Sequence, residues 1–370
     1  MNDVISAEQK TLYISHEYTD KNGWGTCTYN WLNGLETDDS TGSVLLTWRK
    51  AQNFKSSNVR ILKVLNSFAD TKFKKLLVFL DEVFIRLRIN IKKFDTVHVM
   101  VEPYIPLAHR LAKIMGAKLI INVHGTYCVR PRQTGHFDKY LLAYQYASLI
   151  ISNSDYTSAR LKDVFGVNSV SVPLGVNNNI FFPLLKETQK KEYFMFVGSS
   201  KPRKGLKFAI EGFYQFLQKY PSYEFIVIGE FDEKSTYNKS ILEFIDTHNL
   251  LVKFLNQVSQ ETLVRHYQET TAHVLPSISE PFYFEGFGLV HLEANCCGSL
   301  SIGSKDSANE EVIINGVSGY LVQQGNANSI AEAMVKSVEL LKDNNSAVRN
   351  NCTQHASNYS WADAIRLMKQ

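Results

Sequence analysis

Several common signatures of protein function are missing from this sequence of 370 residues. Its five cysteines include no Cys-x-x-Cys pair, which argues against a zinc site or a disulfide framework and favours reduced thiols. No apolar run approaches the roughly 18 residues that a membrane span needs. The segment Met1–Lys10 is polar and has no apolar signal-peptide core. We therefore expect a cytoplasmic protein.

Well-known catalytic motifs are missing as well. There is no Gly-x-x-x-x-Gly-Lys-Ser/Thr loop, so ATP hydrolysis of the Walker type is unsupported, and no Gly-x-Ser-x-Gly elbow of a hydrolase. No Asp-x-Asp pair is present to hold a divalent cation against a diphosphate, and we expect no metal requirement. The net charge of +4 is too small to indicate a nucleic-acid-binding protein.

What is present is an ordinary globular composition, with 44% hydrophobic and 21% charged residues, in a chain long enough for two domains. Short apolar runs alternate with helical patterns, which predicts parallel, doubly wound sheets. The pattern breaks near 181–188, where we place the domain boundary. The predicted strands are Thr11–Ser15, Ser43–Trp48, Val97–Glu102, Lys118–His124, Leu149–Asn153 and Ser169–Pro173, then Tyr193–Val197, Glu224–Ile228, Val252–Leu255, His273–Leu275, Leu300–Ile302 and Gly319–Val322.

The segment 281–298 sets two carboxylates eight positions apart around a Gly-Phe-Gly turn. Glu285 lies in a loop, and Glu293 lies about two turns into the helix that follows. A carboxylate accepts paired hydrogen bonds from vicinal hydroxyls, so two of them can hold two polyols, such as a hexose and a ribose. The alternative is a loop glutamate and a solvated helix glutamate.

The segment Val197–Gly205 ends a strand in a glycine turn and then presents three cations within four residues. Because anions favour helix N-termini and charge-assisted hydrogen bonds, this is the outline of a diphosphate clamp. A solvated basic turn is the alternative. His124 follows a buried strand at the sheet edge where α/β proteins bind ligands, although a structural histidine is the commoner outcome. Gly23-Trp-Gly25 is only a weak dinucleotide signal.

Further segments that bear on the assignment are Val172–Asn177, Phe254–Val258, Glu311–Gly319 and Tyr359–Trp361. The order of all these elements resembles the retaining glycosyltransferases of the GT-B fold, family 4. The likeness is strong over 193–340 and looser over 1–185. It implies an α/β protein with two Rossmann-like, doubly wound parallel-sheet domains facing a central cleft. Residues 1–185 would bind the acceptor, 186–355 the nucleotide-sugar donor, and a helix within 356–370 would pack back toward the N-terminal domain.

The resemblance also implies a role for each matching residue. Glu293 would bind the ribose hydroxyls, and Glu285 the hydroxyls of the donor sugar. Lys204 and Arg203 would neutralise the diphosphate, while His124 would approach the anomeric carbon; with Glu285, these form the expected catalytic set. The other expected donor-binding residues are Gly23, Gly25, Ser199, Lys201, Val258, Phe287, Gly288 and Leu289.

One position departs from the family pattern. Many members carry an arginine directly after the strand-ending glycine, where this chain has Ser199. Arg203 is the expected substitute, since an Arg-Lys-Gly order occurs elsewhere in the family. No side chain stands out as a covalent nucleophile, which favours front-face attack with the departing diphosphate taking the acceptor's proton.

We therefore expect a retaining, metal-independent hexosyltransferase without a cofactor, which uses a nucleotide diphosphate sugar, UDP favoured over GDP. Bacterial surface polysaccharide or glycoconjugate synthesis is the expected role, with a glycan, lipid-linked or small-molecule acceptor and no nucleic-acid partner. The alternatives are a nucleotide-sugar epimerase of the same architecture and a catalytically impaired glycosyltransferase-like subunit. A nicotinamide-dependent dehydrogenase is disfavoured by the incomplete glycine fingerprint.

The stretch 71–94 carries seven lysines and arginines around an apolar stripe. It could lie on an anionic membrane, which would place the protein peripherally at the inner face. A domain helix that buries this stripe is the favoured interpretation, because the stripe has the width of a core-facing surface.

Overall fold

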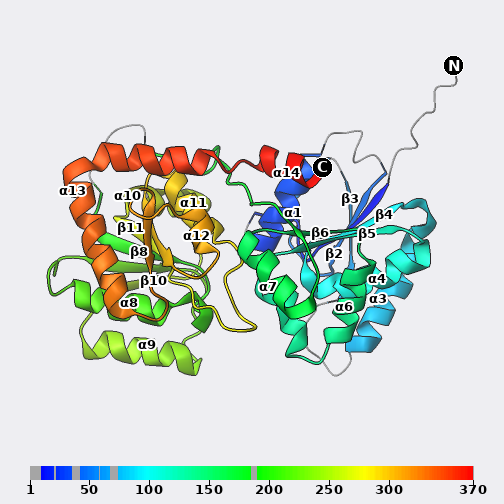
Figure 1. The fold of residues 1–370 in the computed structure, drawn as a ribbon, viewed down its shortest axis with the longest axis horizontal. Coiled ribbons are helices and arrows are strands. Elements are labelled where there is room, and N and C mark those ends of the chain that lie inside the picture. The colour runs from blue at the N-terminus through cyan, green and yellow to red at the C-terminus, as the bar shows by residue number, and fades with distance from the viewer. Residues whose placement is uncertain are drawn as a thin grey trace, which may run out of the picture. The chain divides into compact units, whose positions relative to one another are not determined.

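The computed structural model describes residues 10–20, 22–35, 42–57, 59–66, 74–184 and 190–369, without the side chains of 74–78 and 369. The chain divides into two compact units (Figure 1). Unit 1 comprises residues 1–173 and 361–370, and unit 2 comprises residues 174–360.

These divisions differ from the predicted boundaries at 185 and 355. The segment after Pro173 already belongs to unit 2, because the N–H of Val176 donates to the carbonyl of Tyr359 (2.9 Å). Farther along, the carbonyl of Phe182 accepts from the side-chain amide of Gln268 (2.7 Å). Both contacts tie the connecting segment to unit 2 before the first strand of that unit begins.

Unit 1 contains a parallel sheet in the order β3-β2-β1-β4-β5-β6-β7. Its strands are β1 Thr11–Ile14, β2 Val44–Trp48, β3 Arg60–Leu65, β4 Thr96–Val99, β5 Lys118–Val123, β6 Leu149–Ser152 and β7 Val170–Ser171. Its α-helices are α1 Gly23–Asn33, α3 Lys74–Arg88, α4 Ile105–Met115, α5 Thr126–Val129, α6 Phe137–Tyr146, α7 Asp155–Phe165 and α14 Trp361–Lys369, with short 3-10 turns η1 Ile91–Lys93, η2 Glu102–Tyr104 and η3 Arg130–Arg132.

Unit 2 contains a second parallel sheet in the order β10-β9-β8-β11-β12-β13. Its strands are β8 Tyr193–Val197, β9 Glu224–Ile228, β10 Val252–Leu255, β11 Ala272–Val274, β12 Leu300–Ser304 and β13 Gly319–Val322. Its helices are η4 Pro202–Lys204, α8 Leu206–Phe216, α9 Thr236–Thr247, α10 Gln260–Glu269, α11 Leu289–Cys296, α12 Asn309–Val312 and α13 Ala327–Ser357. Figure 1 shows α13 as two arms, which meet at the non-helical Asn344. The predicted α/β class with two doubly wound parallel sheets is confirmed.

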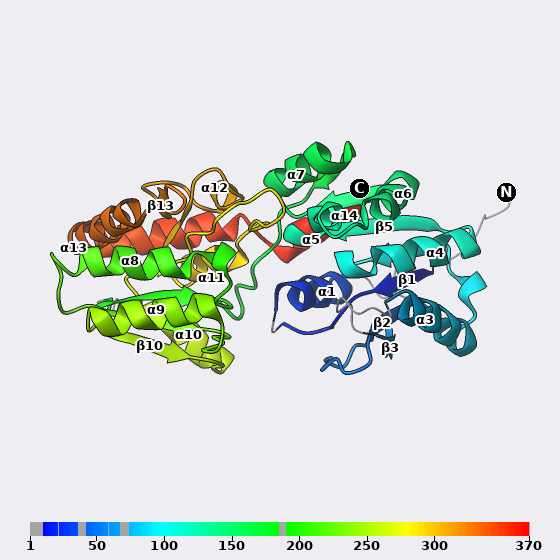
Figure 2. The same cartoon turned by 90° about the horizontal axis from the view of Figure 1, so that it is seen from below.

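Local sequence explains several helix ends and packing contacts. The Ser154 hydroxyl accepts the N–H of Thr157 (2.9 Å) at the start of α7, and Gly166 ends that helix in a left-handed conformation. In unit 2, α8 and α13 lie side by side (Figure 2), and a Cβ at Gly212 would come within 2.9 Å of the Ala327 carbonyl oxygen. Glycine therefore permits this close helix packing.

Both sheets reverse their strand order once, between β1 and β4 in unit 1 and between β8 and β11 in unit 2. Such switch points open a crevice at the carboxyl ends of the strands, where α/β proteins bind ligands. We therefore expect ligand-binding residues directly after these four strands.

Candidate functional site

The turn after β8 is held rigidly at the switch point of unit 2. Gly205 has a positive φ of 75°, and a Cβ there would lie 1.9 Å from the carbonyl oxygen of Pro276. No other residue fits this position without moving the backbone. The carbonyl of Arg203 also accepts the N–H of Ile278 (2.7 Å). The basic turn is thus fixed against the segment that follows β11.

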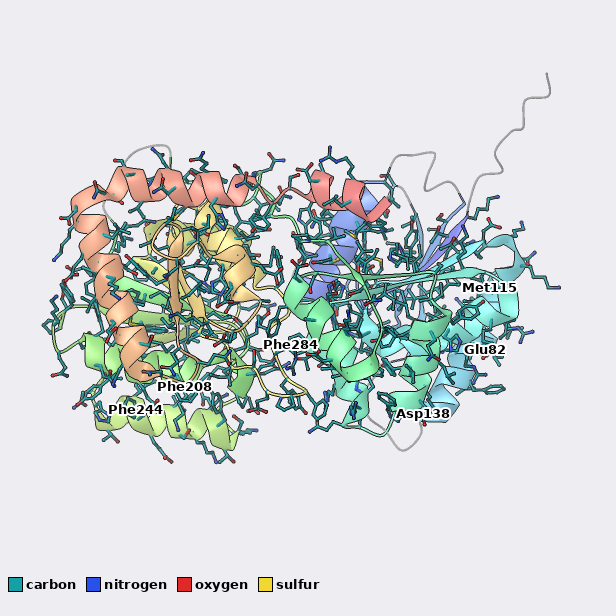
Figure 3. The ribbon with its side chains drawn as sticks, viewed as in Figure 1. Glu82, Met115, Asp138, Phe208, Phe244 and Phe284 are labelled. Atoms are coloured by element: carbon teal, nitrogen blue, oxygen red, sulfur yellow. The ribbon has the colours of Figure 1, made fainter. Side chains whose placement is uncertain are left out.

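This packing brings two predicted cations and one predicted carboxylate together. Glu285 Oε2 lies 2.5 Å from Lys204 Nζ and 2.9 Å from Arg203 Nη1. Burial raises the pKa of Glu285, but Lys204 and then Arg203 outweigh it and lower that pKa to about 2. Burial lowers the pKa of Lys204, against the opposing charge of Glu285. The neighbouring Phe284, labelled in Figure 3, is buried at 1% exposure.

The loop then enters α11 through a residue that must be glycine. Gly288 has φ 91°, and a Cβ there would come within 2.8 Å of both the Asn309 amide nitrogen and a His291 ring carbon. The first N–H groups of α11 follow directly, at Leu289 and beyond. Phe287 is buried at its side chain, so the loop can offer a ligand chiefly backbone groups here.

Glu293 lies within α11 and has no cation beside it among the residues that the structure describes. Its Oε2 accepts a hydrogen bond from the hydroxyl of Tyr267 (3.1 Å). Burial raises the pKa of Glu293 to about 7, and the Tyr267 hydrogen bond lowers it by less. No local sequence pattern points to Tyr267, which lies 26 positions before Glu293.

The remaining predicted donor residues of unit 2 follow β8 and β10, which lie on either side of β9 in the same sheet. Ser199 follows β8, where Gly198 packs so closely on Gly229 that a Cβ at Gly229 would lie 2.4 Å from the Gly198 carbonyl oxygen. Lys201 is exposed, and its charge lowers the pKa of Lys204. Val258 is half-buried in the loop after β10. Carboxyl ends of parallel strands share one edge, so these residues lie along it.

In unit 1, the predicted glycine loop forms the start of α1. The Asn22 side chain accepts the N–H of Gly25 (2.9 Å) and caps the helix. A Cβ at Gly25 would lie within 2.7 Å of Thr19 backbone, whereas Gly23 is exposed and has nothing within 4 Å. Packing therefore requires glycine at the second position only.

His124 follows β5 and is held at three polar points. Its N–H donates to Glu102 Oε1 (2.6 Å), and its carbonyl accepts from the side-chain amide of Asn153 (3.2 Å). Its Nε2 lies 2.8 Å from the Met100 carbonyl oxygen. A carbonyl can only accept, so Nε2 carries the proton and Nδ1 is the acceptor. Burial lowers the pKa of His124 to about 4, so the ring is neutral.

Sequence reasoning missed Glu102 and Asn153. The predicted strand Val97–Glu102 is too long, because β4 ends at Val99 and Glu102 instead begins η2. The available signal was an acidic side chain just beyond a buried apolar run, at the sheet edge that binds ligands. Of the predicted site residues, Gly23, Gly25 and His124 lie in unit 1, and all the others lie in unit 2.

Among the described residues, no group of three or more His, Cys, Asp or Glu side chains is arranged to hold a metal ion. Within that same part of the chain, no helix is long and apolar enough to cross a membrane. All five cysteines are buried and outside any disulfide.

Two family models match consecutive parts of the sequence. Residues 22–179 match the Glycosyltransferase Family 4 model, and residues 177–358 match the model for Glycosyl transferases group 1. The chain belongs to the group 1, family 4 glycosyltransferases. This confirms the resemblance drawn from the motifs.

Curated relatives of this family 4 chain are similar over part of their length. A probable sucrose-phosphate synthase of Thermosipho melanesiensis is 27% identical over 194 residues, which cover 49% of this chain and 45% of the relative. A phosphatidyl-myo-inositol mannosyltransferase of Mycolicibacterium smegmatis is 25% identical over 252 residues, which cover 66% of this chain and 62% of the relative. The chain thus spans about half to three-fifths of the length of these relatives.

Solved structures share the GT-B fold of this family 4 chain. Anabaena HepE, solved in complex with UDP and glucose, has a TM-score of 0.76 and 16% identity over 98% of both chains. A sucrose-phosphate synthase from Thermosynechococcus elongatus has a TM-score of 0.76 and 19% identity, again over 98% of both chains.

Proposed function

We propose that this protein is a retaining glycosyltransferase that moves a sugar from a UDP-sugar to an acceptor hydroxyl. The observation that carries the proposal is the partly buried cluster of Lys204, Arg203 and Glu285 at the switch point of unit 2. Cations fixed there can bind a diphosphate. Because they are already in position, they stabilise the negative charge that develops on the leaving group without rearranging.

The donor would occupy the carboxyl edge of the unit 2 sheet. Its diphosphate would compete with Glu285 for Lys204 and Arg203, and the N–H groups at the start of α11 would add anion-binding dipoles. Glu285, released from one or both cations, could accept hydrogen bonds from sugar hydroxyls. Glu293 would accept from the ribose hydroxyls in its ionised form. UDP is favoured because the fold neighbour HepE is solved with UDP.

Retention would follow from front-face attack, in which the departing diphosphate oxygen takes the proton of the acceptor. Bond formation to the anomeric carbon and loss of the nucleoside diphosphate would then occur on the same face. Lys204 and Arg203 would stabilise the negative charge on the leaving group, without a metal ion. His124 would approach the donor sugar with a neutral ring that accepts at Nδ1.

Unit 1 would bind the acceptor, in bacterial surface polysaccharide or glycoconjugate synthesis in the cytoplasm. Helix α3 supports peripheral contact with an anionic membrane carrying a lipid-linked acceptor. It buries Ile85, yet leaves Phe79 51% and Leu87 77% exposed. The exposed Arg86 and Arg88 lie beside them. Apolar side chains flanked by cations suit an interfacial helix. A soluble glycan or small-molecule acceptor is the alternative to a lipid-linked one.

The test is calorimetric binding of UDP, GDP, ADP and NAD to the purified protein, with Glu293→Ala and Glu285→Ala alongside. We expect tight binding of UDP, weakened in Glu293→Ala because the ribose loses its acceptor. In Glu285→Ala the binding should be kept or strengthened, because Glu285 no longer competes with the diphosphate for Lys204 and Arg203. Equal losses in the two variants would contradict the roles assigned to these glutamates. Binding of NAD in preference to all three nucleoside diphosphates would contradict the transferase itself.

Product analysis with a UDP-sugar separates the other candidates. Release of free UDP with a glycosylated acceptor supports the transferase. An isomerised UDP-sugar, formed without an acceptor, would favour an epimerase of the same architecture. Failure to bind any nucleotide would favour a catalytically impaired subunit, a candidate that Ser199 keeps open because the usual arginine is missing there.

A further inference from the structure

Two separate segments of unit 1 converge on one buried carboxyl group. Glu102 follows β4, one of the two strands at the switch point, and its side chain is fully buried. Its Oε1 accepts the N–H of His124 (2.6 Å). The N–H of Gly125 and the Trp24 indole also favour the charged form of this carboxyl and lower its pKa. Trp24 belongs to α1, which follows β1, the other strand at the switch point.

The surroundings of Glu102 explain why this contact stays in place. Its own carbonyl accepts the hydroxyl of Tyr140 (3.1 Å), so its backbone is anchored as well. Its Oε2 makes no hydrogen bond of standard geometry within the described part of the chain, so the approach of Trp24 is looser than that of His124. The carboxyl group therefore interacts chiefly with the backbone N–H groups of the turn after β5.

A carboxyl group at this buried position destabilises the fold. Burial raises the pKa of Glu102 to about 7, and no salt bridge to Glu102 is found among the described residues. An ionisable group in such surroundings destabilises the fold more than an amide that accepts the same hydrogen bond. Perturbed, buried carboxyls of this kind gather at functional sites.

Without Glu102, the turn would keep the contacts of His124 with Asn153 and Met100 but would lose the hydrogen bond that holds its backbone N–H. Gly125 has φ 137° and ψ −132°, a conformation open to glycine alone, and a glycine turn has many alternatives once its hydrogen bond is lost. The ring of His124 follows its backbone, because its Nε2–H is bound to the Met100 carbonyl only in the observed arrangement.

We propose that Glu102 is a positioning residue for the transfer reaction, which fixes the backbone of His124 and Gly125 so that the His124 ring stays oriented. This inference rests on the proposed function, in which His124 lies beside the donor sugar. Glu102 itself does not touch a substrate. It acts through the hydrogen bond to the His124 N–H, a role in which an amide oxygen can replace a carboxylate oxygen.

The test compares Glu102→Ala, Glu102→Asp and Glu102→Gln with wild type, with Glu82→Gln as the matched control. Glu82 is another buried glutamate of unit 1, on α3 (Figure 3), where it pairs with Arg110. We expect kcat to fall about tenfold or more in the alanine and aspartate variants. Glu102→Gln should stay within about threefold of wild type. KM for the UDP-sugar should hardly change, because the donor is bound by unit 2.

A second readout needs no catalysis. Hydrogen exchange at the amides of His124 and Gly125 should accelerate about tenfold or more in Glu102→Ala and Glu102→Asp, and should be preserved in Glu102→Gln and Glu82→Gln. Unchanged exchange in Glu102→Ala and Glu102→Asp would overturn the proposal. A Glu102→Gln variant as inactive as Glu102→Ala would also overturn the proposal, because it would show that the reaction needs a carboxyl group that binds and releases a proton. If wild type transfers no sugar, the proposed function fails, and the exchange data alone decide the role of Glu102.

Discussion

The two units place a carboxylate beyond equivalent strands, and the two groups have opposite character. Glu285 follows β11 and Glu102 follows β4, each the strand beyond the switch point of its sheet. The Glu102 side chain is fully buried and that of Glu285 is 14% exposed, yet the pKa of Glu285 is about 2 and that of Glu102 about 7. The difference comes from Lys204 and Arg203, which contact Glu285, whereas Glu102 meets only N–H groups. Burial alone therefore does not set the charge of a site, and nearby cations do.

This contrast fits the division of labour that we propose. A site with fixed cations suits a diphosphate, while a site with a neutral His124 and no cation beside its carboxyl group suits a hydroxyl group. The loop after β8 supplies three cations in four residues, but the segment after β1 presents His16 and Glu17 instead. Burial lowers the pKa of His16, which further reduces positive charge there.

The largest expected effect comes from removing the nearer of the two cations that contact Glu285. Lys204→Met should reduce the free energy of unfolding by about 3 kcal/mol, because a mostly buried carboxylate loses its nearer cation. Adding Glu285→Gln should restore part of that loss, since the carboxylate is then neutral and only the partly exposed Arg203 is left without its ion pair. Urea unfolding of both single variants and the double variant at pH 7 measures the coupling.

A lysine outside the site provides the control for this cycle. Lys253 makes an equally short ion pair with Glu224 (2.6 Å), but its side chain is 59% exposed. Lys253→Met should therefore leave stability almost unchanged. If Lys204→Met were no worse than Lys253→Met, the ion pair could not account for the low pKa of Glu285, and the comparison between the two carboxylates would collapse.

The sequence predicted the sheet of unit 2 better than its site. Continuous apolar runs such as Tyr193–Val197 matched the observed strands, because strands buried on both faces need them. The edge strand β3 was missed, since Arg60 and Lys63 interrupt its apolar pattern. The pairing of Arg203 with Glu285 spans 82 positions and depends on the fit of Gly205 against Pro276, which no local pattern encodes.

The next effect concerns stability and pH in unit 1. The pKa of Glu102 lies near 7 in the folded protein, above its ordinary value of 4.5. Its stabilising contribution is therefore complete below pH 4.5 and is lost as pH rises to 7. Relative to Glu102→Gln, wild type should lose about 2 to 3 kcal/mol of unfolding free energy between pH 5 and pH 8. Urea unfolding at several pH values gives the difference, and parallel stability curves would show that Glu102 ionises normally.

The smallest effect tests whether unit 2 contains both kinds of carboxylate. The pKa of Glu293 is about 7, whereas Glu285 stays ionised throughout the neutral range. In the role that we propose for Glu293, the ionised carboxylate accepts from both ribose hydroxyls, so UDP affinity should rise up to about tenfold from pH 6 to pH 8. In Glu293→Gln, calorimetry should find no such rise, and the remaining pH dependence of UDP affinity should come from titration of the phosphates alone. Glu285→Gln should show the same rise as wild type. An identical pH dependence in Glu293→Gln and wild type would mean that the ribose does not bind Glu293.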